Sequence, residues 1–124
     1  MSRTKRRSIC PVACSLDLLG DRWTLLVIRD LFAGKSRFGD FLASPEGIAT
    51  NILATRLEGL QSGGLVASEA CAERAGALRY QLTPRGMALL PVLGALKDWG
   101  LAHIPGTEAR MRVPVRLDRK KRGA

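Results

Sequence analysis

The sequence predicts a mainly helical α+β domain, and two patterns in its 124 residues indicate this. Apolar residues recur at helical spacing through residues 11–60, and a strictly alternating apolar and polar segment follows at residues 78–82. Several helices followed directly by a two-stranded hairpin are the order of a winged helix-turn-helix domain, in which the hairpin is the wing. We therefore expect one domain over residues 10–104, between a basic arm at residues 1–9 and a basic tail at residues 105–124.

The charge of the chain is concentrated at its two ends. The net charge is +9 and the pI is about 10.5, which favours a polyanionic partner. Residues 3–7 contribute +4 and residues 110–124 contribute +6, whereas residues 8–109 carry a net charge of −1. The apolar runs are too short for a membrane span, the N-terminal segment lacks the apolar core of a signal peptide, and three cysteines do not form a disulfide framework. We expect a cytoplasmic protein with a nearly neutral folded body and no membrane partner.

Local signals place two helices at the start of the domain. Pro11 suits the first helical position, which makes Cys10 the N-cap of a helix over residues 11–19. Asp21 is the expected N-cap of a second helix over residues 22–33, whose apolar side chains begin the predicted core.

Residues 48–64 contain the predicted helix around which the domain is organised. A short helix capped by Ser36 and a Ser-Pro-Glu-Gly break precede it, so the two helices predict a helix-turn-helix. Its leucines Leu53, Leu57 and Leu60 fall on one stripe. The opposite face carries short polar side chains, which suit close approach to base edges in a DNA groove. From spacing alone, an ordinary amphipathic helix of an all-α domain is an equal alternative.

The period of the apolar residues changes after this helix. Strands are predicted over residues 65–71 and 78–82, which makes the hairpin. Thr83 is the expected N-cap of a last helix that runs from about residue 84 to residue 104, and Pro91 should kink or restart it. This helix has apolar residues on more than one face, so we expect it to pack both on its own domain and on a partner.

Eight short motifs resemble the HxlR-type transcriptional regulators over residues 10–103. They are residues 10–12 (CPV), 20–26 (GDRWTLL), 37–38 (RF), 41–42 (FL), 53–57 (LATRL), 64–66 (GLV), 80–86 (YQLTPRG) and 90–93 (LPVL). The resemblance implies a winged helix-turn-helix that binds double-stranded DNA. The chain departs from the family pattern at Ala49, where a hydroxyl residue usually caps the recognition helix, and at Ala54, where threonine is usual. The hairpin tip is also shorter and less basic than is usual, so the resemblance does not supply the operator sequence.

The central helix supplies the first candidate DNA contacts. Thr50 and Asn51 lie at its start and are expected to meet base edges, with Thr55 and Arg56 on bases or phosphates. Asparagine can pair with adenine through two hydrogen bonds, and a good pair provides about 1–3 kcal/mol of discrimination.

Two neighbouring segments supply the other candidates. Ser36 and Arg37 begin the preceding helix, whose free N–H groups and dipole can hold a phosphate. An ordinary cap beside a solvated arginine is the alternative. Arg74 and Arg79 lie in the hairpin, from which they can reach phosphates or the minor groove, although Arg79 can equally be the solvent-facing member of an alternating strand.

Cys10 is a candidate redox or electrophile sensor. A helix N-terminus and the nearby cations Arg6 and Arg7 favour the thiolate, and exposed thiolates are the reactive form. Several HxlR-type regulators have their sensing cysteine at the matching place, which the resemblance carries to Cys10. The alternative is a small, half-buried packing residue. A bond to Cys14 within one helix would have poor geometry, so oxidation would more readily link two subunits.

Together these patterns predict a homodimeric DNA-binding regulator. The first and last helices would form the dimer and place two recognition helices in successive major grooves, about 34 Å apart, on a roughly palindromic operator. A basic RNA-binding or ribosome-associated winged domain is the runner-up, and a protein-interaction module is a third reading. One histidine and the lack of a phosphate-binding loop or clustered carboxylates argue against an enzyme. Zinc-ligand types occur at Cys10, Cys14, Cys71 and His103, but their spacing does not match a zinc site, so no metal or cofactor is expected.

Overall fold

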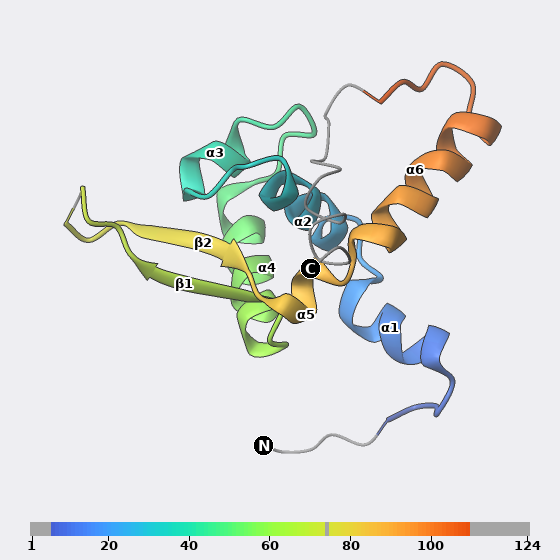
Figure 1. The fold of residues 1–124 in the computed structure, drawn as a ribbon, viewed down its shortest axis with the longest axis horizontal. Helices are drawn as coiled ribbons and strands as arrows, with labels where there is room; N and C mark the ends of the chain where they lie inside the picture. The colour runs from blue at the N-terminus through green and yellow to red at the C-terminus, as the bar shows by residue number, and fades with distance from the viewer. Residues whose placement is uncertain (1–5, 74, 110–124) are drawn as a thin grey trace, which may run out of the picture.

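The computed structural model describes residues 6–73 and 75–109 of the chain. The elements run in the order α1 (Pro11–Leu19), α2 (Thr24–Phe32), α3 (Phe38–Leu42), α4 (Thr50–Ser62), β1 (Val66–Ala70), β2 (Leu78–Leu82), α5 (Pro84–Met87) and α6 (Leu90–His103). Figure 1 shows the hairpin of β1 and β2 projecting from one side of the helical body, with α1 and α6 on the opposite side. This is the predicted winged helix-turn-helix. Among the described residues, each helix is too short or too polar to cross a lipid bilayer.

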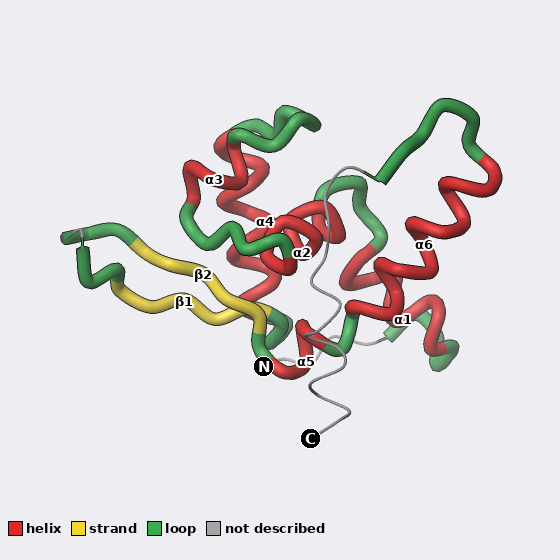
Figure 2. Tube along the Cα trace, turned by 45° about the horizontal axis from the view of Figure 1, so that its top comes forward, coloured by secondary structure: helices red, strands yellow, loops and turns green. Residues whose placement is uncertain are grey.

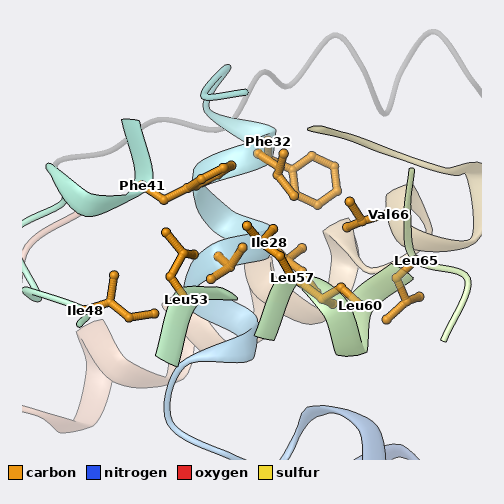
Figure 3. Close-up of a cluster of buried hydrophobic side chains, with 11 residues drawn as sticks. Ile28, Phe32, Phe41, Ile48, Leu53, Leu57, Leu60, Leu65 and Val66 are labelled. Carbon is orange, nitrogen blue, oxygen red and sulfur yellow. The ribbon is translucent and has the colours of Figure 1, made fainter. Parts of the chain in front are cut away.

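Helix α4 is anchored by its leucine stripe, as the spacing predicted. Leu53, Leu57 and Leu60 are buried against α2, Phe41 and the start of the wing (Figure 3). Burial of a leucine side chain contributes about 1.5–3 kcal/mol, so this stripe determines which face of α4 turns outward. The helix ends in a Schellman arrangement, in which the Leu65 N–H donates to the Leu60 carbonyl (2.9 Å) and Gly64 adopts a positive φ of 79°.

Two helix starts differ from the prediction, and at each of them a carboxylate accepts from N–H groups at the start of the helix. Helix α2 begins at Thr24 rather than residue 22, and Asp21 accepts hydrogen bonds from the N–H groups of Trp23 (2.9 Å) and Thr24 (3.1 Å). Helix α3 has Arg37 at the N-cap position rather than Ser36. Here Asp40 reaches back across one turn and accepts from the Arg37 N–H at 3.0 Å.

The wing is joined to the segment that precedes α3. Strands β1 and β2 pair antiparallel from Val66 opposite Leu82 to Ala70 opposite Leu78. On its other edge, β2 meets Ser36, whose carbonyl accepts a hydrogen bond from the N–H of Tyr80 at 2.7 Å. Figure 2 shows this loop running alongside β2. The wing is therefore a continuation of the helix-turn-helix and not a separate appendage.

The predicted last helix is two helices. Thr83 caps α5 through its hydroxyl, which accepts from the Gly86 N–H at 3.1 Å, as expected. The chain then restarts at Leu90, with Leu89 as the N-cap of α6. Pro91 lacks an N–H and suits the first turn of a helix but not its interior, which explains the restart.

Candidate nucleic-acid interface

The outward face of α4 is polar and exposed at its N-terminal end. Thr50, Asn51 and Thr55 are all exposed there, opposite the buried leucines. The Thr55 hydroxyl donates to the Asn51 carbonyl at 3.0 Å, which directs its oxygen lone pairs away from the helix axis. The face therefore carries short, exposed polar side chains, as the sequence predicted.

A buried polar network holds the turn that leads into α4. Asp30 of α2 is 3% exposed and accepts from the Ser44 hydroxyl (2.6 Å), and Lys35 donates to the same hydroxyl (2.6 Å). Arg29 donates to both Asp30 (2.8 Å) and Glu46 (2.8 Å), so the two ends of the turn are tied to α2. The bond from Arg29 lowers the pKa of Glu46, against the raising effect of partial burial, and Glu46 in return raises the pKa of the guanidinium.

Arg56 braces α4 against the start of α2. Its Nε lies 2.7 Å from Oδ2 of Asp21, across 35 residues of sequence. Partial burial alone would raise the pKa of Asp21, but hydrogen bonds from Thr24, Trp23 and Arg56 outweigh it and lower the pKa to about 2. Arg56, which was predicted to contact DNA, therefore already has a structural partner in the protein, and its pair with Asp21 helps to fix the position of α4.

Two predicted contacts near the tip of the wing share one acidic partner. The Nη2 atoms of Arg37 and Arg79 lie 3.4 Å and 3.1 Å from Oε1 of Glu73. The buried Cys71 thiol donates to the same oxygen at 3.0 Å, which together with Arg79 holds the pKa of Glu73 below its usual value. The structure thus brings Arg37 and Arg79 together. No local sequence pattern predicted that these two residues would meet. The other predicted wing contact, Arg74, lies outside the described residues.

The start of α3 is satisfied internally. The N–H groups of Ser36 and Arg37 donate to Asp40 at 3.3 Å and 3.0 Å, and the Ser36 carbonyl accepts from Tyr80. The N–H groups of Ser36 and Arg37 are therefore not free to bind a phosphate, because a carboxylate of the same helix accepts from them. At the start of α3, the Arg37 side chain is still a candidate for contact with a DNA phosphate.

Cys10 occupies the predicted N-cap of α1 and is exposed. Its N–H donates to the Ser8 hydroxyl at 3.0 Å, and Cys14 donates to the Ser8 carbonyl at 3.3 Å. Arg7, one of the two cations expected beside Cys10, pairs instead with Asp17 at 2.7 Å. Across residues 6–73 and 75–109, no three His, Cys, Asp or Glu side chains gather as metal ligands.

The side of the domain opposite the wing exposes large apolar side chains. They come from the segment containing α1 and from α6 with the residue that follows it. They are Ile9, Val12, Leu16, Leu18, Val92, Leu96, Trp99, Leu101 and Ile104. In Figures 1 and 2 the two helices lie on the same side of the body. Neither α1 nor α6 has a buried residue, so both are only half packed within the domain.

Relatives of known class cover most of this chain. An HTH-type transcriptional regulator of Synechocystis sp. is 37% identical over 92 residues, which is 74% of this chain and 68% of that protein. The HTH-type transcriptional regulator YvaP of Bacillus subtilis is 32% identical over 90 residues, covering 73% of this chain and 83% of that protein.

Solved structures share the fold. The transcription factor PA1607 superposes with a TM-score of 0.76 at 40% identity, over 90% of this chain and 78% of its own. The redox regulator HypR in its reduced form gives 0.71 at 28% identity, over 77% and 95%. The reduced transcriptional regulator YodB of B. subtilis gives 0.66 at 28% identity, over 82% and 100%. The HxlR-like helix-turn-helix family matches residues 18–108, so this chain belongs to that family of DNA-binding transcriptional regulators.

Proposed function

We propose that this regulator binds DNA sequence-specifically, as a homodimer on a roughly palindromic operator. The observation that carries the proposal is the exposed N-terminal face of α4, which three buried leucines and the Asp21–Arg56 pair hold outward beside the wing. Thr50 and Asn51 are the side chains on this face that read bases.

Selection of duplexes from a random pool tests base reading. We expect Asn51→Ala to change the preferred base at one position of each half-site and to weaken binding to the selected duplex by about 1–3 kcal/mol per half-site. Gln61→Ala is the matched control, because Gln61 is exposed at the other end of α4 and bonds to Ser68 of the wing strand. An equal loss of affinity on every duplex would contradict base reading by Asn51.

The dimer would form through the apolar faces of α1 and α6. Side chains such as Val12 and Trp99 are 66% and 58% exposed, and joining two copies would cover them. We expect sedimentation to show a dimer and Leu96→Asp to give a monomer with weaker operator binding. Leu78→Asp is the control for the sedimentation measurement alone, because it adds the same charge to an exposed apolar position in the wing, away from α1 and α6. A wild-type chain that sediments as a monomer would refute this part of the proposal.

Cys10 is the proposed sensing residue. It is exposed at a helix N-cap, and HypR, whose fold this chain shares, is a redox regulator. Treatment with diamide should change operator affinity in the wild type and in Cys14→Ser, and should leave Cys10→Ser unchanged. An equal response in Cys10→Ser would assign the effect to another thiol.

The basic arm and tail are proposed to raise affinity without setting sequence preference. Residues 1–5 and 110–124 lie outside the described residues, so this proposal is based on their charge. Each neutralised phosphate adds about −0.9 to the slope of log K against log salt concentration. Deletion of residues 110–124 should flatten this slope and leave the preferred sequence unchanged. An unaltered slope would show that the tail makes no phosphate contact.

A further inference from the structure

Near the tip of the wing, two cations from different elements meet a single carboxylate oxygen. Arg37 precedes α3 and Arg79 belongs to β2, yet both Nη2 atoms approach Oε1 of Glu73, at 3.4 Å and 3.1 Å. Two guanidinium groups around one anionic oxygen also form the arrangement that suits a phosphate oxygen. The position is therefore a phosphate-sized anion site that the protein's own acid occupies.

The two cations are held by backbone structure, whereas the anion is not. Arg37 and Arg79 are partners in an antiparallel bridge, and the adjacent Tyr80 N–H bonds to the Ser36 carbonyl. Glu73 lies in the hairpin connection beyond the end of β1, and its side chain is 63% exposed. An incoming anion can replace this carboxylate without moving the arginine backbones.

We propose that Arg37 and Arg79 form a clamp for one backbone phosphate of duplex DNA, and that Glu73 occupies the clamp in the free protein as a competitor that the phosphate displaces. The proposal rests on the proposed function, in which α4 and the wing face the duplex. It adds a residue, Glu73, that acts against binding. Because every duplex presents the same phosphates, Glu73 sets overall affinity and does not alter sequence preference.

The consequence can be measured as affinity and as salt dependence. In the free protein, the negative charge of Glu73 partly neutralises Arg37 and Arg79, which weakens their attraction for a phosphate. Glu73→Gln removes the negative charge but keeps an oxygen that can accept from Cys71. We expect binding to tighten about two- to tenfold for each subunit that contacts the duplex, on selected and random duplexes alike, the range for the loss of one or two exposed ion pairs. We also expect the salt slope to steepen by up to about 0.9 for each subunit, corresponding to one phosphate per clamp.

Further variants separate the clamp from a general charge effect. Asp98→Asn changes the net charge equally, but Asp98 lies on α6, on the side opposite the wing, and pairs with Lys97. Because α6 belongs to the proposed dimer interface, sedimentation first checks that this variant has the same oligomeric state as the wild type, and it should then leave both affinity and slope unchanged within error. In an Arg37→Gln background, Glu73→Gln should give a smaller gain than in the wild type, because one arm of the clamp is absent. Glu73→Ser should reproduce Glu73→Gln, which excludes an effect of the amide itself.

Each result of fluorescence anisotropy titrations on these proteins decides the matter. Failure of the wild type to bind any duplex would reject the proposed function, and the clamp with it. Wild-type binding that Glu73→Gln does not tighten would reject the clamp alone. An equal gain in Asp98→Asn, or a full gain in the Arg37→Gln background, would also reject it, since the effect would not pass through this anion site.

Discussion

The pair of Asp21 and Arg56 makes the anchoring of the recognition helix sensitive to acid. Both carboxylate oxygens of Asp21 are in use: Oδ1 accepts from the Thr24 hydroxyl, and Oδ2 accepts from Arg56 and from the N–H groups of Trp23 and Thr24. Asp21→Asn leaves only one accepting oxygen and places an NH2 group against donors. In either orientation of the amide, the substitution therefore removes the hydrogen bonds that one of the two carboxylate oxygens accepts.

The lowered pKa sets the size of the effect. A change from 3.8 to about 2 corresponds to about 2.4 kcal/mol if solvent does not screen the carboxylate. The Asp21 side chain is 30% exposed, so screening reduces this, and we expect Asp21→Asn to lower the free energy of unfolding at pH 7 by about 1–2 kcal/mol.

The sign of the pH dependence follows from the direction of the shift. A carboxyl group with a lower pKa in the folded state stabilises that state above its unfolded pKa, near 3.8. The contribution is lost as the pH falls through the folded value of about 2. The difference in unfolding free energy between the wild type and Asp21→Asn should therefore be constant from pH 7 to about pH 5 and should shrink between about pH 4 and pH 2.

Urea denaturation followed by tryptophan fluorescence measures this difference, at one fixed protein concentration because of the proposed dimer. Asp17→Asn is the control: it removes the exposed pair with Arg7 and should change stability by less than about 0.5 kcal/mol. The reasoning is refuted if Asp21→Asn is as stable as the wild type at pH 7, or if the difference persists undiminished at pH 2.

Three other substitutions test the framework around α4. Leu57→Ala should cost about 2–5 kcal/mol of unfolding free energy, because Leu57 is 2% exposed in the core. Gly86→Ala should destabilise by about 1–3 kcal/mol or more, since a Cβ there would lie 2.2 Å from the Leu65 carbonyl oxygen. Ser44→Ala should cost about 1–3 kcal/mol and weaken operator binding, because it removes a hydrogen bond from the buried Asp30 at the turn before α4.

Matched substitutions at open positions give the reference for these three. Leu78→Ala removes a leucine that is 44% exposed and should cost less than Leu57→Ala. Gly39→Ala adds a Cβ with no heavy atom within 4 Å and should be neutral or stabilising. Ser62→Ala, at the exposed end of α4, should leave stability nearly unchanged. Chemical denaturation of all six variants would contradict the packing argument if the pairs did not differ in this order.

Local patterns predicted the elements whose stability is local. Strand β2 has the predicted bounds because strict alternation over residues 78–82 leaves one way to place its faces. The helical spacing of Leu53, Leu57 and Leu60 likewise predicted which face of α4 is buried. The start of α3 was placed one residue early, because Asp40 and Ser36 are both good capping residues and only the folded chain shows which one is used.

The contacts that position the interface join residues far apart in sequence, and periodicity does not reveal such pairs. Arg56 and Asp21 are 35 residues apart, and the meeting of Arg37 with Arg79 depends on how the wing pairs with the loop before α3. One sequence feature does indicate a long-range contact, because Asp30 lies among the buried apolar residues of α2. An acid at such a position requires a partner, which is the Ser44 turn before the recognition helix.

The hydrogen bond between Tyr80 and Ser36 also bears on how the affinity of this regulator can be controlled. It ties the wing to the loop before α3, so we expect the wing and the helix-turn-helix to keep their relative positions when the two subunits of the proposed dimer move. We expect control to act on the separation and tilt of the two copies in the proposed dimer. Half-sites one helical turn apart fix the required span at about 34 Å, and a small rotation of rigid subunits is enough to lose it.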